Sequence, residues 1–274
     1  MPGWLANADA SGALAAASGA GPYFTIEPWA EGEGWRPATL LVSDPAVLVE
    51  RVDYARAVIA GRAQIAPAEV AERVAASIVF LGLAARLVSP SLGAVVLGGV
   101  VPYLTLDNMW WRPVNGGPVP LAAGPIAGRE IDGAEPGRQL DDAAAMLSEH
   151  CVQGMASPMA DVFQGLFRLS PLVLRGNIAS ALAGAAGRLT GSFPDRADTA
   201  AQLTARVLAL EPLRGSGELV QPDTSQPRRF LIRRSCCLYY RVPGGGTCGD
   251  CVLTPDRVRR QQWQAALKGS AAAG

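Results

Sequence analysis

Apolar residues recur at intervals of three and four positions over long parts of the chain, and this is the period of an amphipathic helix. The clearest example predicts a helix over residues 67–88, with Val70, Val74 and Ile78 on one face. A preceding helix is predicted from Pro45 to about Gly61. Similar patterns predict later helices over residues 141–153, 158–169, 171–189, 195–210 and 255–268.

Five dipeptides made of a capping residue and a proline mark predicted helix starts. The side-chain oxygen of the first residue accepts a hydrogen bond from a free backbone N–H, and proline at the first helical position has no N–H to lose. The five dipeptides are Asp44-Pro45, Ser89-Pro90, Ser157-Pro158, Ser170-Pro171 and Thr254-Pro255.

Segments with strand character are few and short. Alternation and β-branching predict strands at residues 23–28 and 39–42, and a third at residues 230–232. Residues 107–138 and 215–227 are rich in proline and glycine, which predicts two long irregular connections. Together with the helices, these segments indicate a single globular α+β fold that is rich in helix and has a small β component.

Residues 87–106 carry no charge and are numerous enough to span a bilayer. The stretch contains Pro90 and Pro102, and Arg86 and Asp107 flank it without a basic cluster on one side. Two buried core elements are therefore expected, with no stable membrane insertion. The N-terminal residues lack the basic start and compact apolar run of a signal peptide, so the expected location is cytoplasmic.

Composition narrows the classes of partner. The 274 residues are 49% apolar and 18% charged, as is typical of a globular protein with a sizeable core. Basic and acidic residues balance at 24 each, so no bulk field favours a nucleic-acid partner. No glycine-rich dinucleotide or phosphate motif follows a predicted strand, and reducing equivalents for any redox reaction are expected from a separate donor.

Four of the five cysteines lie close together near the C-terminus. Cys236 and Cys237 are adjacent, ten residues follow, and Cys248 and Cys251 complete the set. Zinc sites usually draw thiolates from pairs about two to four residues apart, whereas neighbouring side chains on an extended segment point apart. The adjacent pair therefore favours a two-iron cluster, while the spacing alone leaves zinc open. Cys151 stands apart and is expected to be a core thiol.

The residues around these cysteines resemble a known signature. Residues 233–241 and 244–251 resemble the C-terminal signature of FhuF-like ferric-siderophore reductases. A softer similarity to the core helices of that family extends the resemblance over roughly residues 66–253. The specific part is the cysteine signature, because the upstream similarity is mostly apolar pattern.

The resemblance implies one 2Fe-2S cluster per chain, bound by Cys236, Cys237, Cys248 and Cys251. It also implies an oxidoreductase that passes one electron from the cluster to siderophore-bound Fe(III) and releases Fe(II). The partners would be a ferric siderophore and an external donor, either a ferredoxin or a flavin reductase. The division expected along the chain is a disordered tail (1–20), a helix-rich siderophore-binding region (21–214) and a cluster region (215–274).

Arginines crowd the cysteine segment. Arg233, Arg234 and Arg241 are candidates for tuning the cluster, because positive charge favours the reduced, more anionic state. A solvated basic patch is the alternative.

Other polar and aromatic residues are candidates for a substrate pocket. Adjacent indoles beside a guanidinium can stack on a bulky chelate, and buried or solvent-facing structural roles are the alternatives. The candidate substrate-binding residues are Trp110, Trp111, Arg112, His150, Arg175 and Asn177. With one histidine, a Rieske centre is excluded within one chain.

Two other functions stay open at the level of sequence. One is a non-catalytic iron–sulfur or zinc-binding module that senses redox state or supports a partner. The other is a protein related to siderophore biosynthesis, for which the chain lacks a nucleotide-binding signature.

Overall fold

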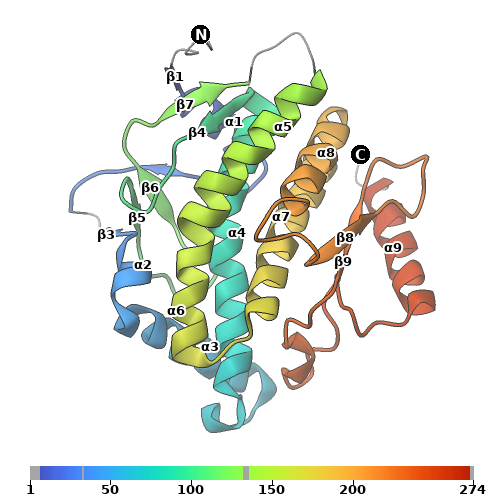
Figure 1. Cartoon of the computed structure of the whole chain (residues 1–274). Coiled ribbons are helices and arrows are strands. Elements are labelled where there is room, and N and C mark those ends of the chain that lie inside the picture. The colour runs from blue at the N-terminus through green and yellow to red at the C-terminus, as the bar shows by residue number, and fades with distance from the viewer. Residues whose placement is uncertain (1–6, 33, 132–135, 272–274) are drawn as a thin grey trace.

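Two long helices, α4 (Glu72–Gly98) and α7 (Pro171–Ser192), pack against each other through the centre of the molecule (Figure 1). This computed structural model describes residues 7–32, 34–131 and 136–271. Helices dominate and the strands form small sheets, so the predicted helix-rich α+β fold is confirmed. Small buried residues such as Ala76 on α4 and Ala179 on α7 allow this close packing.

Helix α4 is longer than its sequence pattern predicts. It passes through Pro90 and ends at Gly98, so the predicted helix start at Ser89-Pro90 is wrong. The Ser89 hydroxyl donates instead to the Ala85 carbonyl, at 2.6 Å. A proline inside a helix costs about 3 kcal/mol. Here every residue from 86 to 96 is buried, and that apolar burial offsets the cost.

By length and composition α4 is able to cross a membrane, and it is the one helix with this property among the residues that the structure describes. However, 72% of its most apolar window is buried inside the structure. The helices packed against it include α1 (Ser11–Ser18), α3 (Pro45–Ala63) and α7. Such extensive burial is typical of the core helix of a globular protein.

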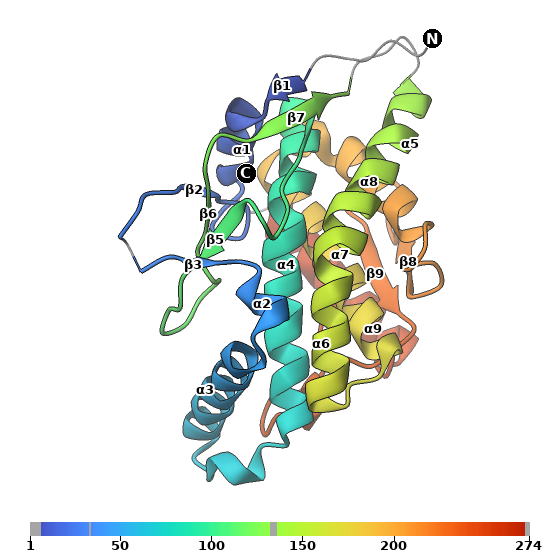
Figure 2. The same cartoon turned by 60° about the vertical axis from the view of Figure 1, so that its left-hand side comes forward.

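Residues 136–167 form one continuous helical rod where the sequence predicts two helices (Figure 2). Helix α5 (Pro136–Leu147) runs into a π-helical stretch, Ser148–Ala156, and then into α6 (Ser157–Phe167). The predicted start at Ser157-Pro158 is therefore wrong. The Ser157 N–H bonds the Val152 carbonyl through the wider π turn, so the rod absorbs a proline that an α-helical ladder would exclude.

The other capping dipeptides stand at helix starts. Asp44 accepts a hydrogen bond from the Ala46 N–H at the start of α3, and Ser170 accepts one from the Leu172 N–H at the start of α7. Helix α9 (Asp256–Ala271) begins directly after Pro255. Helix α8 (Ala197–Leu208) confirms the helix predicted after residue 195.

The strands form three small sheets within the described residues. One sheet has the order β1-β7-β4, a second β2-β6-β5-β3, and the third is the antiparallel pair β8-β9. The strands are β1 (Asn7–Asp9), β2 (Glu27–Pro28), β3 (Arg36–Pro37), β4 (Val100–Pro102), β5 (Met109–Trp111), β6 (Leu121–Ala123), β7 (Ala127–Glu130), β8 (Gly217–Val220) and β9 (Phe230–Arg233).

Several expectations for the irregular segments need correction. Residues 107–138 contribute three strands rather than one long loop, because their short apolar runs pair at the edge of the core. The strand predicted at residues 39–42 is instead the short helix α2 (Leu40–Ser43), whose Leu41 is buried in the core. The strand predicted at 23–28 shortens to β2, whereas β9 confirms the strand predicted at 230–232.

The expected disordered tail is wrong for residues 7–20. Strand β1 pairs with β7, and α1 packs against α4. Gly98 makes this packing close, because a Cβ there would lie 2.7 Å from Ala13 Cα. Ala10, Ala13 and Ala17 are buried. The small residues that suggested a disordered tail therefore form the buried face of a helix. Residues 1–6 of the expected tail lie outside the described residues.

Candidate functional site

The four clustered cysteines lie on one loop that closes on itself beside β9. The Arg233 N–H donates to the Asp250 carbonyl at 3.2 Å and so joins the two ends of the loop. The loop turns tightly at Leu238, whose φ is 67°, and at Gly244 and Gly246, whose φ values are 72° and 68°. These left-handed positions favour glycine, and the Gly-rich run therefore serves the turn. Closure brings sulfurs from both halves of the loop together.

Two of the four thiols form a close pair, and the other two sulfurs accept backbone hydrogen bonds. The Sγ atoms of Cys237 and Cys248 lie 3.4 Å apart. Cys236 and Cys251 each accept a hydrogen bond at sulfur from the backbone N–H two residues later, at 3.3 and 3.4 Å. Cys237 and Cys251 are buried, whereas the other two are partly exposed. Backbone N–H groups directed at sulfur are a feature that stabilises anionic thiolates.

Cys237 and Cys248 ionise as a pair. Loss of one proton leaves a thiolate that the remaining S–H stabilises, which lowers the pKa of Cys237 to about 6 and raises the pKa of Cys248. The positive charge of Arg233 favours the thiolate form of both residues. The environment of this pair therefore favours one thiolate, the form of cysteine that binds metal.

A chain of buried hydrogen bonds ties this loop to the helical core. The buried Arg233 donates to Asn177 Oδ1 on α7 at 2.7 Å. Asn177 in turn donates to the backbone carbonyl and the hydroxyl of Ser77 on α4, at 3.0 and 3.1 Å. The Ser77 hydroxyl donates to the Cys237 carbonyl at 2.8 Å. One network therefore fixes a cysteine of the loop against both central helices.

Gly176 makes this docking sterically feasible. A Cβ at this position would collide with the Ser235 hydroxyl and with the Arg233 guanidinium. The loop residue before the cysteine pair and the buried arginine therefore both lie directly on the α7 backbone. This is a close approach that only glycine permits.

Two further contacts fix the second half of the loop. Ser180 of α7 donates a short hydrogen bond to the Asp250 carboxylate. Burial raises the pKa of Asp250, while Ser180 and the charge of Arg233 oppose this shift. Arg259 of α9 is buried and donates to the carbonyls of Cys251 and Thr254, at 3.2 and 2.8 Å. Helices α7 and α9 thus hold the loop from two sides.

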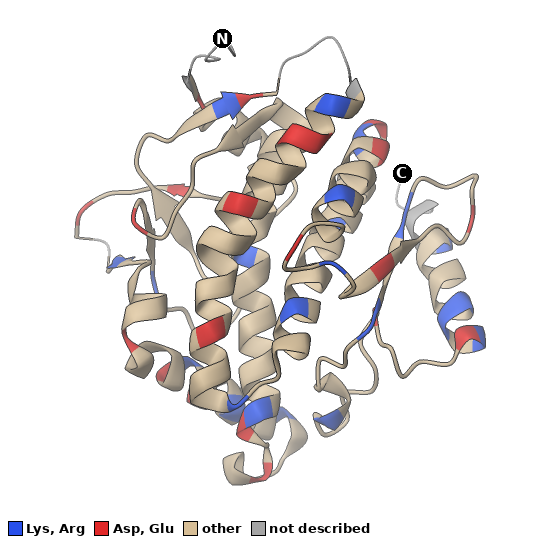
Figure 3. Cartoon of the chain, in the orientation of Figure 1, with Lys and Arg blue, Asp and Glu red and all other residues tan. Residues whose placement is uncertain are grey.

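The three candidate tuning arginines have different environments. Arg233 is 1% exposed and lies near both thiols of the close pair. Arg234 and Arg241 are exposed, and the Arg241 guanidinium lies 5.6 Å from the ring centroid of Tyr240. Figure 3 shows that basic positions also follow β9 and α9 on this side of the molecule. Arg233 is therefore the charge most closely coupled to the cysteines.

The candidate substrate residues do not gather around one point. Among them, Asn177 joins the cysteine loop through Arg233. Trp110 stacks on Trp29 with a centroid distance of 4.5 Å, and Arg112 pairs with Glu27 at 3.0 Å.

The remaining three candidates lie in separate places. Trp111 is buried in the core under two arginines. His150 lies on the π-helical stretch with its ring 5.4 Å from that of Tyr103, and Arg175 is exposed on α7. The role of each as a substrate ligand stays a prediction.

Sequence reasoning missed the supports of the cysteine loop. Ser77, Gly176 and Ser180 lie on two helices far from the loop in sequence, and only the fold brings them to it. Arg259 follows Cys251 by eight residues, but nothing in the local sequence marks it as a support. Asp250 is the exception, because its position between two cysteines marks it as part of the loop.

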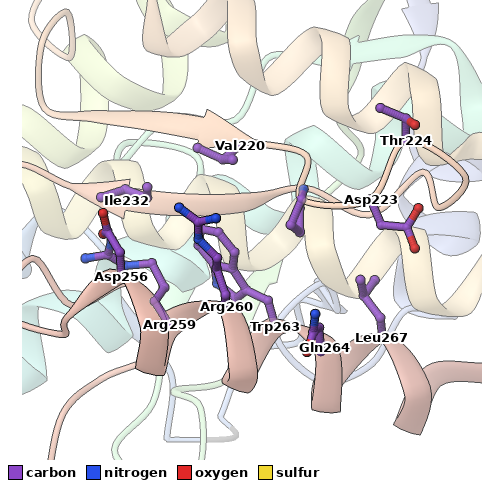
Figure 4. Close-up of a pocket in the computed structure, with 11 residues that line it drawn as sticks. Val220, Asp223, Thr224, Ile232, Asp256, Arg259, Arg260, Trp263, Gln264 and Leu267 are labelled. Carbon is purple, nitrogen blue, oxygen red and sulfur yellow. The ribbon is translucent and has the colours of Figure 1, made fainter.

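A hollow of about 710 Å³ lies beside the loop, between the β8-β9 hairpin and α9 (Figure 4). Trp263 of α9 is 6% exposed and stacks on Phe230 with a centroid distance of 5.3 Å. Charges of both signs line the hollow, including Asp223, Asp256 and Arg260. Arg259 lines this hollow and also donates to the Cys251 carbonyl, so the hollow adjoins the cysteine loop.

The donor set of the loop fits a cluster. Four thiols lie within one short loop, two of them in contact. No group of three or more His, Cys, Asp or Glu side chains converges on a single metal-ion position in the described part of the chain. A 2Fe-2S cluster takes four thiolates shared between two irons, and the four cysteines of this loop supply that number.

Comparison with known families identifies this loop. Residues 233–253 match the family described as FhuF 2Fe-2S C-terminal domain. A search of curated proteins found no match. The family match agrees with the resemblance carried by the cysteine signature and indicates a 2Fe-2S cluster in this segment.

Proposed function

We propose that this iron–sulfur protein is a ferric-siderophore reductase, which transfers one electron to siderophore-bound Fe(III) and releases Fe(II). The observation that carries the proposal is the loop of four cysteines, which matches the FhuF 2Fe-2S domain and lies docked on the helical core. The proposed ligands are Cys236, Cys237, Cys248 and Cys251.

The chemistry of the substrate explains why one electron suffices. Siderophores hold iron through hard, anionic oxygen ligands, which bind Fe(III) far more tightly than Fe(II). The bound 2Fe-2S cluster supplies a one-electron couple. Reduction converts Fe(III) to Fe(II) and weakens the chelate, while the electron is replaced from an external donor. No proton transfer or covalent step is needed, so the chain requires no general acid, base or nucleophile.

The protein contributes position and charge. The network from Arg233 through Asn177 to Ser77 holds the loop in one place on the core. The buried guanidinium of Arg233 favours the more anionic, reduced state of the site. Five free cysteines support a reducing compartment, and we place the reaction in the cytoplasm.

The direct test uses the protein in its reduced form under anaerobic conditions. A ferric siderophore is added, and Fe(II) is trapped by a chromophoric chelator while cluster reoxidation is followed by absorption. We expect stoichiometric Fe(II) release that matches the fraction of cluster reoxidised. A cluster that cycles reversibly but releases no Fe(II) would reject the reductase and favour the redox-sensing module.

A further inference from the structure

A cleft beside the cysteine loop is independent of the candidate substrate residues discussed above. It consists of two adjoining hollows, of about 530 and 300 Å³, which share Ile59, Arg62 and Ile78 in their walls. Helices α3 and α4 form its floor. We call this continuous hollow the α3–α4 cleft.

One end of the α3–α4 cleft is built by the cysteine loop itself. Tyr239, Val242 and the glycines Gly244 and Gly245 line it. All of these residues lie between the two halves of the cysteine set in sequence. A molecule bound at this end therefore lies against the loop that carries the sulfurs.

The charges in the α3–α4 cleft have one sign. Arg51 and Arg62 are the charged residues among its described lining, which includes no carboxylate. The Arg51 Nε atom is buried and has no hydrogen-bond partner, although the guanidinium lies 5.7 Å from the ring centroid of Trp111. A buried guanidinium donor without an acceptor is a group that an anionic ligand would satisfy.

Aromatic surfaces accompany these charges. Tyr23 and Tyr54 line the cleft and are 39% and 41% exposed. The wall near them is rigid, because the buried Arg86 donates to the carbonyls of Tyr23 and Val119, which both line the cleft. The cleft thus offers fixed aromatic faces and positive charge, whereas the hollow beside α9 mixes both signs.

We infer that the α3–α4 cleft binds the ferric chelate as an anionic complex, with Arg51 and Arg62 facing its charge and the iron toward the cysteine loop. The inference rests on the proposed reductase function, because it assigns the place of that substrate. It moves the expected substrate site away from the Trp110–Arg112 segment to the groove between two helices.

The test measures binding apart from electron transfer. The probe is the Ga(III) complex of a hexadentate tris-catecholate chelator, which is trianionic and is not reduced by iron–sulfur proteins. Binding to the cluster-loaded protein is measured by calorimetry. A Cβ at Gly82, in the cleft wall, would meet nothing within 4 Å, so Gly82→Phe fills the cleft without a backbone clash. Gly184→Phe on α7 has equally open space and is the matched control.

We expect Gly82→Phe to weaken binding at least about tenfold and Arg62→Gln to weaken it about fivefold, since one partly exposed charge contributes on that scale. Gly184→Phe and Arg260→Gln, the latter in the hollow beside α9, should bind like the unmodified protein. The Ga(III) complex of a tris-hydroxamate that carries a free ammonium group should bind more weakly than the trianion.

Wild-type affinity in both cleft variants, equal losses in the controls, or no binding of the trianion would each overturn the inference. If Gly82→Phe does not load its cluster, Arg62→Gln against Arg260→Gln decides. Binding in the cleft without Fe(III) reduction would reject the reductase and leave the cleft assignment standing. Full reduction by Gly82→Phe would reject the cleft and leave the reductase standing.

Discussion

At the scale of single residues, burial separates Arg233 from the other arginines around the cysteine loop. A charge in water is screened, while a charge with 1% exposure acts through a medium of lower polarity. Arg233 also has no carboxylate in hydrogen-bond contact among the described residues, and its partners are Asn177 and backbone carbonyls. Its positive charge therefore acts on the two thiols of the close pair and, at longer range, on the Asp250 carboxylate.

Replacing Arg233 should change the reduction potential of the loaded protein. We expect Arg233→Gln to lower the potential by roughly 40–90 mV, which corresponds to about 1–2 kcal/mol for a one-electron couple. Arg234→Gln and Arg241→Gln should shift it less, since both side chains are exposed. Voltammetry of proteins with equal iron content is the measurement, and Arg233→Lys, which keeps the charge, is the control. Equal shifts at all three positions would show that burial does not focus the charge.

The cysteines fall into two classes that substitution should separate. Changing any one of Cys236, Cys237, Cys248 and Cys251 to serine should remove or severely reduce bound iron and sulfide. Cys151→Ser should leave both unchanged, because Cys151 lies in the core and burial raises its pKa to about 11. The readout is iron and sulfide content with the visible spectrum. Loss of iron from Cys151→Ser at unchanged thermal stability would contradict the assignment.

At the scale of helices and strands, local sequence correctly predicts those helix N-termini at which the capping residue leaves the helical conformation. Asp44 and Ser170 cap α3 and α7 because their own backbone is extended there. The same dipeptide chemistry fails at Pro90 and Pro158, where burial in α4 and a π turn carry the helix onward. Tertiary packing decides these cases, and no local pattern contains that information.

The close contact between α7 and the cysteine loop depends on the absence of a side chain at Gly176. We expect Gly176→Ala to push Ser235 and Arg233 off the α7 backbone, because a Cβ there collides with both. The loop should then lose iron several-fold faster to a chelator, although alanine favours the helix itself by about 1 kcal/mol. The measurement is the rate of cluster loss at fixed chelator concentration.

Gly184→Ala is the control for this prediction, since it makes the same change on α7 in open space. It should retain the cluster at the original rate and unfold at the same or a higher temperature. If Gly176→Ala behaves like Gly184→Ala, the docking seen at Gly176 does not limit cluster retention.

At the scale of the whole molecule, the cysteine spacing allowed the sequence to identify the cluster loop, but not what surrounds it. The close pair and the glycine turns involve residues within one short segment of the sequence. Ser77 lies 160 positions from its loop partner Cys237, and Gly176 lies about 60 positions from Ser235 and Arg233. Such contacts arise only when α4 and α7 pack together. The α3–α4 cleft could not be predicted from the sequence for the same reason, because residues distant in sequence line it.

The arrangement of the whole chain also bears on the expected source of the electron. The described strands form sheets of two to four short strands, and none is a doubly wound sheet of the kind that binds dinucleotides. The glycine run that the sequence does contain lies in the turn of the cysteine loop. NADPH alone should therefore not reduce the cluster at a useful rate, whereas a ferredoxin or a flavin reductase should.

Basic positions on β9 and α9 lie beside the loop (Figure 3), and we expect them to attract an acidic donor. The rate of cluster reduction by a ferredoxin should consequently fall as salt rises, because the screening length shrinks from about 10 Å at 0.1 M to about 3 Å at 1 M. Stopped-flow bleaching of the cluster measures this rate, and Arg234→Gln should flatten its salt dependence. Rapid bleaching by NADPH with the purified protein alone would contradict the need for a separate donor. A rate that is independent of salt would place the donor on another face of the molecule.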